Sequence, residues 1–192
     1  LEKAFKRFKD RQDPAGFYPA WSGIVETYVY EWGDMAPLDR WIEEIGALQK
    51  SYPQFPSPRI EAKVTSAVFC ALIYRRLDHP DMGYWHERVK EMIYNTNDIH
   101  LQFGLGSHLI IYYSWMIGGQ DKAKFLADFL QQGLSKKADI APLYQITWHS
   151  INGSILWMTN HFRESQGELT KGQNIAEKEG IHFWDFMLLA NL

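Results

Sequence analysis

The sequence predicts an all-α fold, and three observations support that prediction. Apolar residues recur at the helical period through most of the 192 residues. No stretch of four or more residues alternates apolar and polar positions as a half-buried strand would. A pair of helices also recurs about every 40 residues, a spacing typical of helical-repeat proteins. We therefore expect a right-handed αα-superhelix, or α-solenoid, of antiparallel helix pairs.

Turn-forming residues divide the first half of the chain into helices. Phe5 and Phe8 among basic residues indicate the tail of an amphipathic helix, which the polar segment 10–14 ends. Gly33 ends the next helix, and Pro37 favours a new start because proline suits the first helical turn. A proline-rich segment then separates this helix from a long, nearly all-apolar one. Helices are expected up to about 9, at about 17–32 and at about 60–77. The helix that Pro37 opens carries apolar residues between 38 and 48, and an amphipathic helix after the long one carries apolar residues between 85 and 93.

The second half repeats the same pair of helices. Gly118 and Gly119 form one turn, Asn160 lies at another, and Gly180 is a suitable residue to cap a helix at its C-terminus. Apolar helices are expected at about 99–117 and 142–159. Each is followed by an amphipathic helix, the first with apolar residues between 125 and 134 and the second with apolar residues between 162 and 176 and an end at Gly180. A last helix is expected from about 181.

The two helices of each pair differ in kind. The first is apolar around most of its circumference, and the second is apolar along one stripe, as stacking of an inner and an outer layer requires. We expect a single helical-repeat domain over residues 1–192, with partial helices at both ends. Because its last residues are still apolar and the chain begins without Met, we expect a fragment of a longer protein. The expected repeats are about 15–55, 56–97, 98–138 and 139–180.

A spacing within the first helices resembles the tetratricopeptide pattern Trp-x-x-Leu-Gly-x-x-Tyr. It begins at Trp21, Ala67, His108 and Trp148, and the position of the pattern's Gly is occupied here by Val, Ala, Tyr and Asn. The resemblance implies a tetratricopeptide-like solenoid, although each unit is longer than the family's 34 residues.

Three segments also resemble the helical-repeat region of large bacterial ATP-dependent transcriptional regulators related to the maltose-operon activator. They are Trp21–Asp34, Pro37–Ile42 and Gly180–Ala190. The resemblance implies a region that senses an inducer or a partner, while separate modules hold ATP and DNA. No Gly-x-x-x-x-Gly-Lys-Ser/Thr sequence occurs, so any ATP site is expected outside this chain.

Composition excludes several classes of function. Hydrophobic residues make up 46% of the chain and aromatic residues 15%, which excludes intrinsic disorder. A net charge of −3 argues against direct contact with nucleic acid. The longest apolar run, 109–117, is too short to cross a membrane, and the single cysteine, Cys70, lies in an apolar run. We expect a cytoplasmic protein without contact to a membrane.

No motif for catalysis or for a cofactor is apparent. His86-Glu87 lacks the second histidine of a zinc motif, and Glu179-x-x-His182 is one motif where a di-iron site needs two. We therefore predict no enzyme activity, no metal and no cofactor. The mixed charges of the second helices, such as Lys124 and Asp128, are interpreted as solvated surface with a smaller chance of a domain contact.

Polar and aromatic residues on the first helices are the candidate binding site. First helices line the concave face of such a superhelix, where a few hydrogen-bonding groups among aromatic walls suit a ligand or a peptide. Packing of these residues in the core is the alternative, and both interpretations stay open. The candidates are Glu26, Tyr30, Tyr74, His108, Tyr112, Trp115, His149 and Asn152.

The predicted function is a non-catalytic sensor or scaffold region of a bacterial transcriptional regulator. It would bind a small-molecule effector, a protein partner or other domains of the same chain on the concave face. The alternatives are a general protein-interaction scaffold without a small-molecule ligand and, third, an all-α enzyme whose acidic or histidine residues cluster in space.

Overall fold

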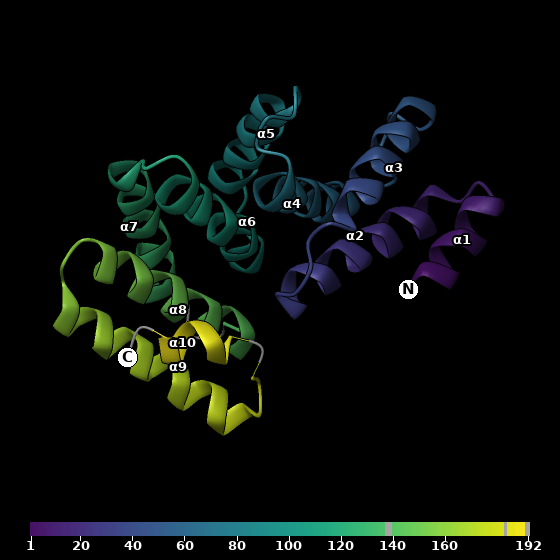
Figure 1. Cartoon of the computed structure of the whole chain (residues 1–192). Coiled ribbons are helices and arrows are strands. Elements are labelled where there is room, and N and C mark those ends of the chain that lie inside the picture. Colours follow the sequence, from purple (N-terminus) through teal and green to yellow (C-terminus); the bar gives the residue numbers. More distant parts are fainter. Residues whose placement is uncertain (137–139, 183, 191–192) are drawn as a thin grey trace. The chain divides into compact units, whose positions relative to one another are not determined.

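The computed structural model describes residues 1–136, 140–182 and 184–190, and every regular element within them is a helix (Figure 1). The predicted all-α class is therefore confirmed. The elements are α1 (Glu2–Asp10), α2 (Pro14–Glu31), α3 (Leu38–Ser51), α4 (Pro58–Arg75), α5 (Met82–Asn95), α6 (Ile99–Ile111), a π-helical segment η1 (Tyr112–Met116), α7 (Gln120–Lys136), α8 (Pro142–Met158), α9 (Phe162–Glu179) and α10 (Asp185–Ala190).

The chain forms two compact units, Leu1–Met92 and Ile93–Leu192, and each is described by itself. Helices that follow one another in sequence pack together in both units. The division into four repeats stays a prediction. Its expected boundary at residues 138–139 lies outside the described residues.

In the first unit, α2 packs against α1, α3 and α4, and α3 packs against α4. The buried indole Nε1 of Trp21 donates a hydrogen bond of 2.9 Å to the backbone oxygen of Trp41. Gly16 lets α1 approach closely, because a Cβ added there would lie 2.1 Å from the Phe8 ring. The core of this unit thus lies between α2 and its neighbours.

In the second unit, α6 packs against α7 and α8, α8 against α9, and α9 against α10. Helices α8 and α9 approach at Gly153, where an added Cβ would lie 2.6 Å from the side chain of Leu169. At the same level Ser165 Oγ donates a hydrogen bond of 2.8 Å to the Gly153 backbone oxygen. The missing Cβ therefore brings the backbone of α8 within reach of a hydroxyl on α9.

The predicted difference between first and second helices is confirmed. In α4, ten residues between Ala62 and Ile73 are buried, and they cover most of the circumference. In α9 the buried residues form one stripe at helical spacing, Ser165, Leu169, Gly172 and Ala176. The opposite side of α9 is thus free to carry charged groups.

Predicted helix ends agree with the structure where glycine or proline marks them. Pro58 opens α4 behind the capping side chain of Ser57, whose hydroxyl accepts a hydrogen bond from the Ile60 amide. Gly180 ends α9 with a φ of 67°, in the left-handed conformation that glycine adopts without strain.

Two predicted ranges are wrong. Residues 99–117 do not form one α-helix, because the last turn is the π-helix η1. The Ser114 hydroxyl donates to the Ile110 backbone oxygen at 2.8 Å, and the Ile117 amide bonds to the oxygen of Tyr112, five residues back. The last helix begins at Asp185 rather than near Ile181, because the Ile181 amide bonds back to Ala176 in the cap that ends α9.

Candidate functional site

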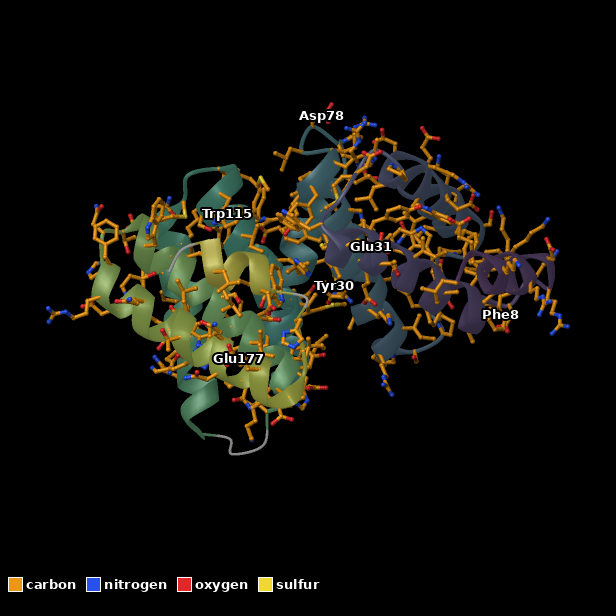
Figure 2. The ribbon with its side chains drawn as sticks, turned by 60° about the horizontal axis from the view of Figure 1, so that its bottom comes forward. Phe8, Tyr30, Glu31, Asp78, Trp115 and Glu177 are labelled. Atoms are coloured by element: carbon orange, nitrogen blue, oxygen red, sulfur yellow. The ribbon has the colours of Figure 1, made fainter. Side chains whose placement is uncertain are left out.

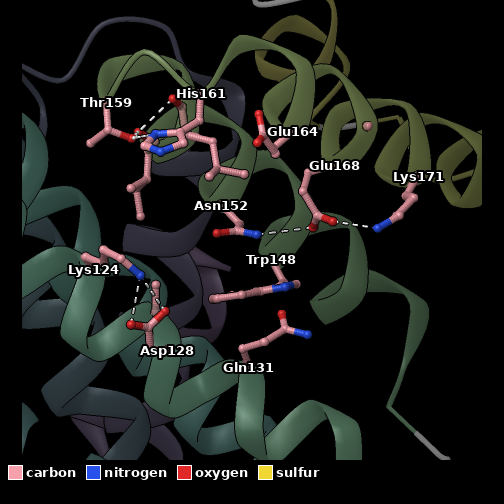
Figure 3. Close-up of a pocket in the computed structure, with 14 residues that line it drawn as sticks. Lys124, Asp128, Gln131, Trp148, Asn152, Thr159, His161, Glu164, Glu168 and Lys171 are labelled. Carbon is pink, nitrogen blue, oxygen red and sulfur yellow. Dashed lines mark hydrogen bonds and ion pairs between the residues drawn. The ribbon is translucent and has the colours of Figure 1, made fainter.

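A pocket of about 720 Å³ lies between α7, α8 and α9 of the second unit (Figure 3). Its volume falls within the range of small-molecule sites in proteins. Nine of the fourteen lining residues are charged or polar, and the other five are apolar residues or glycine. The lining residues are Lys124, Ala127, Asp128 and Gln131 from α7, Trp148, Asn152, Ile155, Leu156 and Thr159 from α8 and its end, and His161, Glu164, Gly167, Glu168 and Lys171 from the start and body of α9.

The carboxylate of Glu168 is the centre of the hydrogen bonding in this pocket. Its Oε2 lies 2.9 Å from His149 Nδ1 and accepts a hydrogen bond of 3.2 Å from Asn152 Nδ2. Its Oε1 accepts a bond of 2.6 Å from Lys171 Nζ. The bond from His149, together with those from Lys171 and Asn152, outweighs burial and lowers the pKa of Glu168 to about 2. Glu168 is therefore ionised at neutral pH.

The charge of Glu168 fixes how its two neighbours on α8 are oriented. A carboxylate only accepts hydrogen bonds, so His149 must carry its proton on Nδ1 and Asn152 must turn its amide nitrogen toward Glu168. The amide oxygen of Asn152 then faces the opposite way, toward the side of the pocket where Lys124 and Asp128 lie (Figure 3). The pocket thus presents the amide oxygen of Asn152 as a hydrogen-bond acceptor, and the bond from the Asn152 amide nitrogen to Glu168 holds it in this orientation.

Helix geometry explains why these side chains meet. Glu164, Glu168 and Lys171 lie four and three residues apart on α9, so they share one face of the helix. This face lies beside the buried stripe that begins with Ser165 and Leu169. On α8, His149 and Asn152 are three residues apart and reach the same carboxylate.

Trp148 contributes a buried wall to the pocket. The residue is 1% exposed, and its ring meets Phe103 edge-on at a centroid distance of 5.5 Å. Its indole Nε1 is buried and has no hydrogen-bond partner in the part of the chain that the structure describes. A buried N–H without an acceptor costs about 1–3 kcal/mol, so an acceptor placed against this nitrogen would stabilise the structure.

Two further charges of the pocket, Lys124 and Asp128, are paired with each other on α7. Lys124 Nζ bonds both carboxylate oxygens of Asp128 at 2.9 Å. Both side chains are more than half exposed, which agrees with their interpretation as solvated surface, and they also form one rim of the pocket. At another rim, Thr159 Oγ1 lies 3.1 Å from His161 Nδ1.

Three predicted site residues lie together in the first unit. Glu26 forms an ion pair of 3.4 Å with Lys63, and burial together with the charge of Glu26 raises the pKa of the Cys70 thiol well above its usual value. Burial raises the pKa of Tyr74 in the same way, with smaller effects from Cys70 and Tyr30. The Tyr74 ring packs edge-on against Trp32 at 5.2 Å, whereas Tyr30 is 44% exposed (Figure 2).

Three other predicted site residues follow one another along α6 and η1. His108 is partly accessible, but the surrounding protein desolvates its ring and lowers its pKa to about 4, so the ring is neutral at pH 7. Tyr112 begins the π-helix and packs against Tyr113 at a centroid distance of 5.8 Å. Trp115, in the same segment, is 39% exposed (Figure 2).

Of the predicted residues, Asn152 is the one that lines the pocket, and His149 supports it through Glu168. Sequence reasoning missed Glu168, Glu164 and Lys171 because they belong to a second helix, whose polar face was expected to be solvated. One signal was present: the three residues share a helix face, and Gly167 lies between them. Trp148 was noted as a repeat position and not as part of a site.

Within 1–136, 140–182 and 184–190, no three His, Cys, Asp or Glu side chains lie close enough together to hold a metal ion. No helix among these residues is long and apolar enough to span a bilayer.

Comparison with known proteins gives no match to a family model, to a curated protein or to a solved structure. The fold and the pocket therefore define this chain as an all-helical protein whose helices pack largely in sequence order, with a polar pocket between three of them. Any narrower assignment depends on the proposals below.

Proposed function

We propose that this chain is a non-catalytic sensor region that binds an effector in the pocket between α7, α8 and α9. The observation that carries the proposal is the Glu168 centre, where His149, Asn152 and Lys171 converge on one carboxylate at the pocket wall. A site held in place before a ligand arrives binds with a smaller loss of conformational freedom. Effector binding would then favour one arrangement of the helices over another.

The wider setting of the proposal is a cytoplasmic bacterial transcriptional regulator of the maltose-activator type. Its helical-repeat region would be a right-handed, tetratricopeptide-like superhelix that reports to other domains or to a protein partner. Packing of α2 on α4 and of α6 on α8 supports this, because first helices of successive repeats contact one another in a solenoid. The resemblance of Trp21–Asp34 and Pro37–Ile42 supports it as well.

A pocket-filling substitution tests the proposal. Gly167 lines the pocket, is exposed, and has open space where a Cβ would stand, so Gly167→Tyr fills the pocket without disturbing the core. Gly46→Tyr on α3 is the matched control, since its Cβ position is equally open. The thermal stability of both variants and of the unaltered chain would be measured with a panel of cationic, anionic and neutral metabolites.

We expect at least one metabolite to raise the melting temperature of the unaltered chain and of Gly46→Tyr but not of Gly167→Tyr. The proposal fails if no metabolite does so, or if the shift is the same in all three proteins.

A protein-interaction scaffold is the second candidate function. Two aromatic side chains at the turn between α8 and α9, Trp157 and Phe162, are 49% and 55% exposed and pack against each other at 6.4 Å. Exposed aromatic residues of this kind are enriched at protein interfaces. Capture of one defined partner that is lost in the double variant Trp157→Ala, Phe162→Ala, without any metabolite effect, would favour this function.

A further inference from the structure

We propose that the effector is a small organic cation, an ammonium or guanidinium group with a carbonyl or hydroxyl oxygen nearby. The inference rests on the proposed function, since it assigns a chemical class to the ligand of the same pocket. Three features of the pocket wall support it. The charge of the Glu164 carboxylate is balanced by neither wall lysine, and the amide oxygen of Asn152 is turned into the pocket. The buried indole N–H of Trp148 has no hydrogen-bond partner among the described residues.

The charges of the pocket wall favour a cationic ligand. The pocket wall holds three carboxylates, Asp128, Glu164 and Glu168, against two lysines. Lys124 is committed to Asp128, and Lys171 to Glu168. The charge of Glu164 is therefore balanced by neither lysine of the wall, and a cationic ligand would balance it.

The position of Glu164 suits this role. It lies one helical turn before Glu168 on α9, and in Figure 3 it lies between His161 and Glu168 at the edge of the pocket. Glu168 itself already accepts bonds from three side chains, so Glu164 is the carboxylate with capacity left for a ligand.

The amide oxygen of Asn152 adds a neutral acceptor on α8. Its orientation is imposed by the ionised Glu168, which accepts the Asn152 amide hydrogen. Ammonium and guanidinium groups donate several hydrogen bonds and accept none, so a wall that combines a carboxylate with an inward amide oxygen matches them. An anionic group would meet repulsion at the same place.

The second part of the ligand follows from Trp148. Within the described part of the chain its buried Nε1 donor has no hydrogen-bond partner, and an acceptor would remove the cost of burying it unpaired. A bare alkylamine would leave it unpaired, whereas a carbonyl or hydroxyl oxygen beside the cation would satisfy it. The apolar residues Ala127, Ile155 and Leu156 also line the pocket and suit the short carbon chain that would join the two groups.

A pair of ligands of closely similar shape, one cationic and one neutral, tests the inference. N-acetyl-L-argininamide carries one guanidinium and two carbonyl groups, and N-acetyl-L-citrullinamide replaces the guanidinium by a neutral urea of the same shape. Their binding to the full chain would be measured by calorimetry at low and at physiological salt. We expect the arginine compound to bind about tenfold more tightly, with the difference shrinking as salt rises.

Variants then locate the effect. Glu164→Gln keeps the shape and removes the charge, so the preference for the arginine compound should disappear while binding of the citrulline compound is unchanged. Glu177→Gln makes the same change on the same helix at an exposed position outside the pocket wall, and should keep the preference (Figure 2). Trp148→Phe removes the indole N–H and should weaken the binding of both compounds by a similar factor, about fivefold.

The inference is overturned if the two compounds bind equally, if neither binds, or if Glu164→Gln and Glu177→Gln behave alike. Failure of the proposed function is recognised separately, by the Gly167→Tyr comparison across all ligand classes. If an anionic or neutral metabolite binds and Gly167→Tyr abolishes its binding, the pocket is an effector site and the assignment to cations alone is wrong.

Discussion

His149 Nδ1 lies 2.9 Å from Glu168 Oε2, and both side chains are at least 85% buried. This contact joins α8 to α9 at the wall of the pocket, 19 positions apart in sequence. The hydrogen bond from His149 is also the largest reason why the pKa of Glu168 is low. The predictions below follow from this centre and from the packing that brings the two helices together.

Glu168→Ala is expected to destabilise the chain by about 1–3 kcal/mol, because it leaves the inward-facing N–H groups of His149 and Asn152 without their acceptor. The free energy of unfolding in urea measures the loss. Glu177→Ala on the exposed face of α9 is the control and should change stability by less than about 0.5 kcal/mol. Equal effects of the two substitutions would contradict the role of the centre.

The low pKa of Glu168 also predicts that the folded chain loses stability in acid. Its pKa is about 2 in the folded chain against an ordinary value of 4.5, so the unfolded chain binds the extra proton first. The contribution of Glu168 is complete above pH 4.5 and is lost as the pH falls toward 2. In Glu168→Gln, the slope of unfolding free energy against pH should be shallower between pH 4.5 and 3. Urea unfolding at several pH values in this range checks it, and an unchanged slope would refute it.

The lowered pKa of His108 predicts a second loss of stability, at higher pH than that of Glu168. The pKa of His108 is about 4 in the folded chain against 6.5 ordinarily, so the neutral ring stabilises the fold fully above pH 6.5. That contribution is lost as the pH falls from 6.5 toward 4, with a slope of at most about 1.4 kcal/mol per pH unit. His108→Gln should flatten the stability profile in this window and leave the window below pH 4 unchanged. Thermal unfolding between pH 7 and 4 distinguishes the two groups.

Gly153→Ala is expected to destabilise the chain by about 1–3 kcal/mol, because the added Cβ would lie 2.6 Å from the buried side chain of Leu169. Gly167→Ala, in the other helix of the same pair, meets nothing within 4 Å and should stabilise by about 0.5–1 kcal/mol through helix propensity. Chemical unfolding of the two single variants measures effects of opposite sign. A stable Gly153→Ala variant would mean that α8 and α9 can separate without loss.

Most of the secondary structure was predictable because helix ends depend on local chemistry. Gly180 marks an end that the structure confirms, the helix expected from about residue 60 begins at Pro58, and the buried stripe of α9 follows the apolar period of its sequence. The π-helix after Ile111 was not predictable, because its sequence keeps an α-helical apolar period. The bond from Ser114 to the carbonyl four residues back does not mark it either, since Ser107 and Ser154 make the same bond inside α-helices.

The candidate site was predictable only in part. Asn152 was selected from its repeat position and does line the pocket, while Glu168 resembled any other charge on a solvated helix face. Glu26, Tyr30 and Tyr74 lie near one another, as expected for one face of the first unit, but their role in binding stays a prediction.

The sequence by itself determined the helical class, the difference between apolar and amphipathic helices, and the ends set by proline and glycine. These depend on side-chain period and on backbone conformations within a few residues. The tertiary structure decided which polar side chains face one another. That choice depends on how far each helix is rotated and how closely it packs, which Gly153 and Leu169 set for α8 and α9. Glu168 is a hydrogen-bonding centre because this packing places it opposite His149 and Asn152.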